Sequence, residues 1–228
     1  MKHQGVKREM IRICQWLAQR AFVAAEGGVV STRVSRNQIL ITPRGRGLGW
    51  VSTEHLVLLD TEGQIVEGEL EPSLSYRLHL TVYRQRREIA AAIQAQPPAA
   101  TAFAVAGTPL VQPVLPQTVL TLGSVAVTKY APPYTEEAAR AIDDLIQRHD
   151  ALLLKNRGLL AIGVSLMDAL QNLERVEQLA STLLAAKALG HIDLLSGTQV
   201  KKLMALRERM NLKGQNPLSG TGQEKKDG

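Results

Sequence analysis

Two apolar segments joined by a short polar turn, with a long helix directly after them, constrain the fold of this chain most strongly. The segment "DALLLKNRGLLAIG", residues 150–163, predicts two strands that turn back on each other at Asn156–Gly158. Ser165 then caps a helix that we expect to run to about Leu189. A strand pair followed by a helix that can cover it indicates a layered α/β domain.

The remaining segments fit the same class, with helices interleaved among mostly short strands. Apolar residues at helical spacing predict helices over 7–25, 73–85 and 135–148, the last capped by Thr135. Strands are expected in "VVSTRV", "QILITP", "HLVLLD" and "IAAAIQA", with a hairpin centred on Glu62–Gly63. "ATAFAVAG" fits a helix or a strand end, and "VLPQTVLTLGSVAVTKY" fits one or two strands.

Composition limits the class of protein. Apolar residues make up 45% of the 228 residues and aromatic residues only 4%, so the core should consist mainly of Leu, Val, Ile and Ala. Cys14 is the only cysteine, which excludes an intrachain disulfide and favours a reducing compartment. No apolar run approaches the ~20 residues that cross a bilayer, and the N-terminal segment lacks the apolar centre of a signal peptide. We therefore expect a cytoplasmic protein without a membrane span.

The basic balance of the chain favours an anionic partner. The formal net charge is +6, and two arginine clusters lie in segments poor in acidic residues: Arg33, Arg36, Arg44 and Arg46, then Arg84, Arg86 and Arg87. A solvated basic surface explains the same clusters. Nucleic-acid binding rests on charge alone, because no aromatic interleaving or groove-reading motif accompanies it.

Sequence-local catalytic motifs are few. The five histidines, at 3, 55, 79, 149 and 191, never stand within five residues of one another, which leaves a local zinc site unsupported. There is no Walker loop, and "GRGLG" lacks the third glycine and the strand–helix setting of a dinucleotide fingerprint. His79 is expected to be a hydrogen-bonded core or interface histidine, and Cys14 a packing residue.

Six segments occur in a recognisable order between residues 7 and 189. They are "EGGVVSTRV", "ILITPRG", "EGELEPSLSYRLHLTVYRQR", "AAAIQAQPPAATAFAV", "YAPPYTEEAARAI" and "ALLLKNRGLLAIGVSLMDALQNLERVE". The first three are similar to G-x-x-G-N-x-S-x-R, L-I-T-P-[ST]-G and E-G-x-x-x-P-S-S-E-x-x-x-H-x-x-x-Y. Together the six resemble the class II aldolase/adducin family. The resemblance implies a three-layer α/β/α fold around a central mixed, mostly antiparallel sheet, the aldolase/epimerase fold.

The departures from that family fall on its metal site. The resemblance implies zinc, held by an H-x-H pair and by the histidine of N-H-G, and these positions are Gln94, Gln96 and Arg157 here. The acidic residue after P-S-S is Ser75. Two neutral amides and a guanidinium offer no anionic or basic ligand, and Arg157 would repel a dication. We therefore expect no metal, no cofactor and no catalytic group at Ser75.

Part of the family's phosphate-binding apparatus remains. By resemblance it is built from loop backbone and hydroxyl groups, which Gly28, Gly45 and Ser73 preserve, whereas Val29, Arg44 and Leu74 do not. Incoming arginines add positive charge to the pocket. The expected anion-binding residues are Gly28, Ser31, Arg33, Arg44, Gly45, Ser73 and Arg157. The alternative is that these residues fill the vacated pocket and stabilise the fold.

Two readings of function follow. The first is a non-catalytic member of the family with an interaction, scaffolding or anionic-ligand-binding role. The alternative is a sugar-phosphate aldolase or epimerase, an aldehyde-lyase, with an altered site in which Arg157 takes the place of the metal.

The expected organisation is one family domain over residues 1–195 and a basic helix with a polar tail over 196–228. That helix sets Val200, Leu203, Met204 and Met210 opposite Lys201, Lys202, Arg207 and Arg209, a pattern for a protein partner or an anionic surface. An ordinary terminal helix packed on the domain explains it equally. The resemblance also implies self-association, as a homotetramer.

Overall fold

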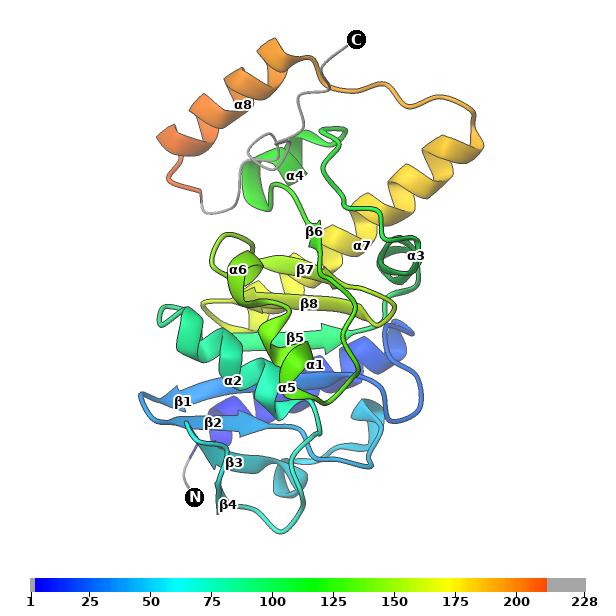
Figure 1. Ribbon diagram of the computed structural model, residues 1–228. Helices are drawn as coiled ribbons and strands as arrows, with labels where there is room; N and C mark the ends of the chain where they lie inside the picture. Colours follow the sequence, from blue (N-terminus) through cyan, green and yellow to red (C-terminus); the bar gives the residue numbers. More distant parts are fainter. Residues whose placement is uncertain (1–2, 213–228) are drawn as a thin grey trace.

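An eight-stranded mixed sheet forms the centre of the computed structural model, which describes residues 3–212. The strand order is β4-β3-β2-β1-β5-β8-β7-β6; every neighbouring pair is antiparallel except β6 with β7. The strands are β1 (Val29–Ser35), β2 (Gln38–Ile41), β3 (Val57–Asp60), β4 (Ile65–Glu67), β5 (Ala91–Ala95), β6 (Ala126–Val127), β7 (Ala151–Leu154) and β8 (Gly158–Gly163). Figure 1 shows the sheet with helices in front of it and behind it.

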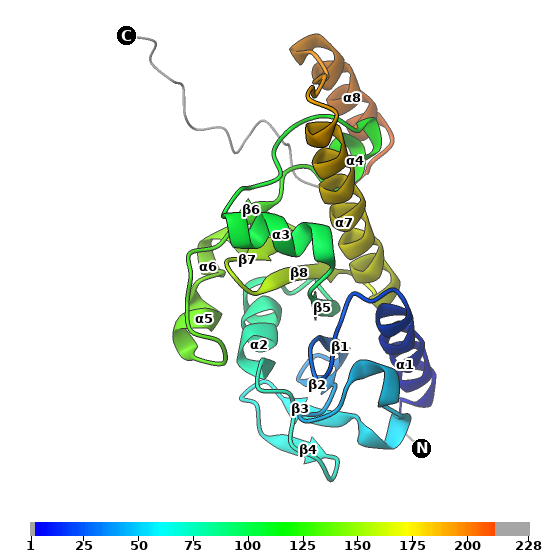
Figure 2. The ribbon, with the colours of Figure 1, turned by 90° about the vertical axis from the view of Figure 1, so that its right-hand side faces the viewer.

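Helices cover both faces of the sheet, as expected for a three-layer α/β/α fold. One layer contains α1 (Gln4–Gln19), α3 (Pro98–Ala106) and α7 (Leu166–Ala188). The other contains α2 (Tyr76–Gln85), α5 (Glu136–Arg140) and α6 (Asp143–Ile146). Figure 2 shows the layers edge-on, with α1 and α7 on the side opposite α2, α5 and α6. The predicted fold class is confirmed.

Alternation along the central strands divides the core between the two layers. On β5, Ala91, Ile93 and Ala95 belong to the cluster beneath α1, α3 and α7, whereas Ala92 faces α2. The neighbouring strand β8 alternates in the same way, with Leu159 and Leu160 on opposite faces. A sheet buried on both faces explains why these strands consist almost entirely of apolar residues.

Local sequence signals placed several elements correctly. The turn at Asn156–Gly158 joins β7 to β8, with positive φ at both residues, and Ser165 accepts a hydrogen bond from the Asp168 N–H at the start of α7. Thr135 caps α5 in the same way. The segment that fitted either a helix or a strand end is helix α3, whose first free N–H groups donate to the Glu177 carboxylate.

Three predictions were wrong. The first helix ends at Gln19 instead of about Ala25, because Ala21 adopts a left-handed conformation that turns the chain. The expected single helix over 135–148 is two short helices, α5 and α6, with Ile142 fully buried at the break between them. The segment 114–130 was expected to hold one or two strands; its first part is instead α4 (Pro116–Thr121), which begins with proline in its first turn, and only Ala126–Val127 forms a strand, β6.

The last described helix, α8 (Gly197–Arg209), packs against α4 beyond the β6 edge of the sheet (Figure 1). Val200 is buried as the expected stripe requires. Arg207, predicted on the basic face opposite that stripe, is also buried, and it lines the cavity beside Arg86. The division of the chain at residue 195 stays a prediction, and the predicted polar tail beyond residue 212 lies outside the described residues. Among the described helices, none is long and apolar enough to cross a membrane.

Candidate active site

Six separate segments of the chain converge on a cleft of about 380 Å³ where β5 ends and β7 turns into β8. A larger cavity, of about 660 Å³, lies on the other side of the molecule beside Arg86 and Arg207 and contains none of the predicted site residues. The cleft is lined by Glu26, Gly27, Gly28, Val29, Pro43, Arg44, Gly45, Ser73, Leu74, Ser75, Gln94, Gln96, Pro133, Tyr134 and Arg157. The positions singled out in the sequence are therefore brought together almost completely.

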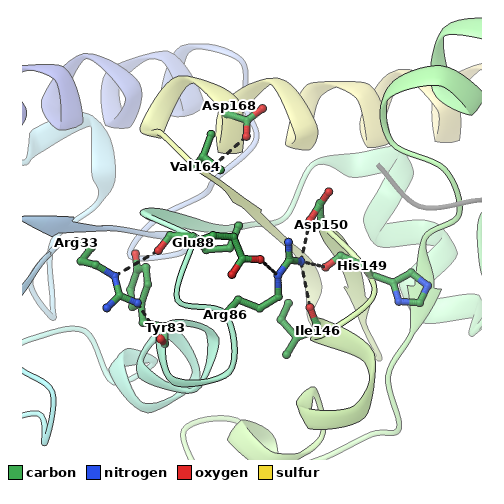
Figure 3. A network of polar contacts seen from close by, with 10 residues as sticks. Arg33, Tyr83, Arg86, Glu88, Ile146, His149, Asp150, Val164 and Asp168 are labelled. Atoms are coloured by element: carbon green, nitrogen blue, oxygen red, sulfur yellow. Dashed lines mark hydrogen bonds and ion pairs between the residues drawn. The ribbon is translucent and has the colours of Figure 1, made fainter. Parts of the chain in front are cut away.

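Two of the expected anion-binding residues lie elsewhere. The Ser31 side chain is fully buried beneath α2, where its Oγ lies 2.7 Å from both His79 Nδ1 and the Tyr83 hydroxyl. Arg33 stacks on the Tyr83 ring and donates to the carbonyl oxygens of Tyr83 and Ile89. Figure 3 shows Arg33 beside Tyr83. Val29, Ser31 and Arg33 alternate along β1 and face the same side of the sheet. Only Val29, at the start of the strand, lines the cleft, because the strand leads away from it.

Sequence reasoning missed Glu26 and Tyr134. Glu26 precedes the glycine pair at 27–28 and is the only carboxylate among the residues that line the cleft within the described chain. Tyr134 directly precedes the Thr135 cap and has a positive φ of 68°. The Thr135 cap could be predicted from the sequence. That Tyr134 would lie at the cleft could not, because its position depends on tertiary packing.

Arg157 occupies the centre of this arrangement. Its Nη2 donates to Ser75 Oγ at 2.9 Å, and its guanidinium carbon lies 5.3 Å from the centre of the Tyr134 ring. Burial lowers the pKa of Arg157 from its usual value, although a guanidinium stays protonated at neutral pH. The turn that carries it requires left-handed backbone at Asn156 and a glycine at 158, where a Cβ would lie 2.5 Å from the Ala95 carbonyl oxygen.

The two glutamines take different places. Gln94 is 4% exposed, and its Oε1 is buried without a hydrogen-bond partner in the described part of the chain. Gln96 lies between two glycines, since a Cβ on Gly27 would come within 2.9 Å of Gln96 Oε1 and one on Gly158 within 3.1 Å of Gln96 Cγ. The amides thus fill the space that close backbone contacts leave at the end of β5.

These side chains do not fit a divalent metal. The positions that the family resemblance assigns to metal ligands present two amides and a guanidinium, beside a serine hydroxyl. A fixed cation at Arg157 opposes a second cation, and neutral amides are weak ligands. Within residues 3–212, no group of three histidine, cysteine, aspartate or glutamate side chains is placed to hold a metal ion.

A layer of buried polar side chains supports the floor of the cleft. His79 is 1% exposed, and its pKa falls to about 3, chiefly because burial disfavours the charged ring and secondarily because Arg157 is nearby. Burial also raises the pKa of Tyr83 above its ordinary range. Both rings are therefore neutral at physiological pH. Their hydrogen bonds to Ser31 tie α2 to β1.

Comparison with known proteins agrees with this geometry. Residues 8–184 match the family described as Class II Aldolase and Adducin N-terminal domain. An L-fuculose phosphate aldolase from Methanococcus maripaludis is 31% identical over 172 residues, covering 75% of this chain and 92% of that protein. A 3-oxo-tetronate 4-phosphate decarboxylase from Haemophilus influenzae is 28% identical over 201 residues, covering 86% of this chain and 95% of that protein.

The solved structure of an L-fuculose 1-phosphate aldolase superposes with a TM-score of 0.84 at 28% identity, covering 93% of this chain and 99% of that one. The family match spans most of the chain, and the relatives are covered over nearly their whole length. This chain belongs to the class II aldolase and adducin family.

Proposed function

We propose that this protein is a lyase that acts on a small phosphorylated sugar acid in the cleft. The relatives described above are named as lyases of phosphorylated sugars or sugar acids, and the chain covers more than nine tenths of each. They support the lyase reading better than the non-catalytic reading that the altered ligand positions suggested. The observation that carries the proposal is the Arg157 guanidinium, fixed in the cleft by Ser75 and Tyr134.

The residues present favour one of the two reactions that these relatives are named for. Aldol cleavage requires a base to remove a hydroxyl proton and an electrophile to stabilise the enolate. Decarboxylation of a 3-oxo acid requires no base for the bond-breaking step, because the carboxylate is already ionised. It needs only a fixed positive group beside the 3-oxo oxygen, where the negative charge develops, and Arg157 supplies one.

The proposed step balances without a metal. The bond between the carboxyl carbon and C2 breaks, CO₂ leaves, and the electron pair forms the C2–C3 double bond while the 3-oxo oxygen becomes an enolate oxygen. Arg157 donates hydrogen bonds to that oxygen. Water then protonates C2, which gives a phosphorylated ketone, so that one proton is consumed for each CO₂ released. Gly28, Gly45, Ser73 and Arg44 stand at the loops proposed to hold the phosphate.

The test is decarboxylation of 3-oxo-tetronate 4-phosphate, generated in situ, by purified protein in the presence of EDTA. We expect CO₂ release above the uncatalysed rate, unchanged by the chelator, and lost in Arg157→Met. Arg12→Met, which removes an exposed arginine from α1, is the matched control and should keep full activity. A rate equal to background, or a rate that the chelator abolishes, overturns the proposal.

A second function is favoured by the same donor set. Glu26 is the only carboxylate that lines the cleft in the described chain, and it is exposed at the rim. A cleft that is lined by arginine side chains but lacks a buried base can bind an anionic metabolite without converting it. Binding of a phosphorylated sugar acid, combined with no turnover of the 3-oxo acid or of sugar phosphates, would select this ligand-sensing function.

A further inference from the structure

Tyr134 holds a backbone conformation that its side chain disfavours. Its φ is 68°, in the left-handed region, where a bulky residue crowds its own backbone and where glycine is the usual occupant. The residue directly precedes Thr135, whose side chain caps α5 and also donates to the Pro132 carbonyl oxygen at 2.7 Å. Neither bond involves residue 134, so a glycine there would allow the same turn without the strain.

The Tyr134 side chain contributes little to the packing of the domain. It is 53% exposed, and within residues 3–212 its hydroxyl group forms no hydrogen bond. Its specific contact is with Arg157, whose guanidinium carbon lies over the ring, 5.3 Å from the ring centre. A strained residue with an exposed ring that lines the cleft indicates a role in function rather than in folding.

The ring restrains Arg157 without neutralising it. Ser75 Oγ accepts one hydrogen bond from the guanidinium, at Nη2, and no other acceptor in the described part of the chain binds this side chain. An aromatic ring attracts a cation through its π-electrons and brings no carboxylate that would cancel the charge. Arg157 therefore keeps its charge and its remaining N–H donors for a ligand in the cleft.

We propose that Tyr134 is a positioning residue for Arg157, and that its left-handed backbone serves to place the ring over the guanidinium. The hydrogen bond to Ser75 fixes one nitrogen of the planar group, and the ring limits its rotation about that bond. A donor that is fixed before the reaction stabilises a developing negative charge without reorganising. The inference rests on the proposed function only for the step that this donor assists, formation of the enolate oxygen.

Three substitutions of Tyr134 separate the ring from the backbone strain. Tyr134→Phe keeps both, Tyr134→Ala removes the ring and keeps the strain, and Tyr134→Gly removes both. For decarboxylation of the 3-oxo acid, kcat should stay within about twofold in Tyr134→Phe and fall about tenfold in the other two variants. KM should change by less than about threefold, because the donor acts mainly in the transition state.

The melting temperature should follow the backbone and not the ring. Tyr134→Gly should melt about 2–4 °C above Tyr134→Ala, since only glycine relieves the left-handed strain. A kcat that is low in Tyr134→Ala and normal in Tyr134→Gly would follow this strain, would assign Tyr134 a structural role and would overturn the inference. Full kcat in both variants overturns it as well.

Nitrogen-15 relaxation of the Arg157 Nε–H group gives a readout that needs no reaction, and its signal is assigned by its absence in Arg157→Met. The order parameter should be about 0.8 in wild type and Tyr134→Phe, and below about 0.6 in Tyr134→Ala and Tyr134→Gly. Equal values in wild type and the three Tyr134 variants refute the positioning role. If the values differ as expected but the wild type releases no CO₂, the proposed reaction fails and the positioning role of Tyr134 stands.

Discussion

Arg157 and Ser75 lie 82 residues apart in the sequence and share a hydrogen bond of 2.9 Å between the guanidinium Nη2 and the serine Oγ. The bond joins the turn between β7 and β8 to the residue before α2, so it spans the cleft. Ser75 is 3% exposed, so solvent does not replace Arg157 as the hydrogen-bond partner of its hydroxyl group.

Replacing Arg157 should lower the decarboxylation rate strongly while changing the free energy of unfolding little. Arg157→Met removes a charged hydrogen bond but also the cost of partly burying a cation, so we expect the free energy of unfolding to change by about 1 kcal/mol or less. The decarboxylation rate should fall by about 100-fold or more, as for the loss of an oxyanion donor. Urea unfolding and single-turnover kinetics measure the two effects. A large loss of stability with an unchanged rate would contradict this assignment.

Introducing three histidines into the cleft should create a metal site. The triple variant Q94H/Q96H/R157H removes the repelling cation and introduces three imidazoles at positions that line the same cleft. We expect about one equivalent of zinc per chain after dialysis against zinc and then against buffer, and none in the wild type. Elemental mass spectrometry measures the content, with Q94H alone as control. Equal zinc in wild type and triple variant would refute the ligand argument.

Stability should fall in mild acid because of His79. Its folded pKa of about 3 lies below the ordinary value of 6.5, so between these pH values the unfolded chain binds the proton that the folded chain excludes. The stability contributed by neutral His79 is complete above pH 6.5 and declines as the pH falls, by up to about 1.4 kcal/mol per pH unit.

Urea unfolding between pH 7.5 and 4.5 tests this effect in wild type and His79→Gln. The variant cannot bind the proton at this position and should show a shallower slope, while His149, whose pKa burial also lowers, contributes equally to both proteins. Identical slopes would mean that His79 is not protonated on unfolding in this range.

An ion-pair cluster at the C-terminal end of α2, the end opposite Ser75, should matter for stability. Arg86 donates from Nη1 to Asp150 at 2.8 Å and from Nε to Glu88 at 2.6 Å, and it also contacts the carbonyl oxygens of Ile146 and His149 (Figure 3). Arg86→Met leaves the largely buried Asp150 carboxylate without this partner, and we expect a loss of about 3 kcal/mol in unfolding free energy.

Arg84→Met is the matched control for that change. Arg84 forms an exposed pair with Glu62 at 3.7 Å, and the loss should be below about 1 kcal/mol. Equal effects in the two variants would mean that burial of the Arg86 cluster does not contribute.

The parts of the fold that could be predicted are those set by local chemistry. Asn156 and Gly158 supply the left-handed backbone that a tight hairpin requires, and Ser165 and Thr135 supply cap oxygens. These turns and helix starts are therefore determined by residues that are neighbours in the sequence. The two-residue strand β6 lies in a segment expected to hold one or two strands, but its pattern is too short to fix its bounds, and it is held by pairing with β7.

The same distinction applies to the cleft. Gln94, Gln96 and Arg157 could be assigned because they stand at positions of a family motif, and the structure brings them together. Ser31 was assigned in the same way, but strand alternation and the packing of α2 direct it to His79 instead. Glu26 and Tyr134 reach the cleft only because distant loops meet there, which no local pattern records.

The strands of this protein form the sheet and its core, whereas its loops carry most of the cleft, and this affects which substitutions the fold tolerates. Most residues that line the cleft belong to loops; only Val29 and Gln94 lie in the named strands, and Pro43 forms an isolated bridge with Pro72. Substitutions there leave the ladder of the sheet and its two apolar layers intact. Side chains of the cleft can therefore be exchanged one at a time in a chain of this fold while the chain still folds.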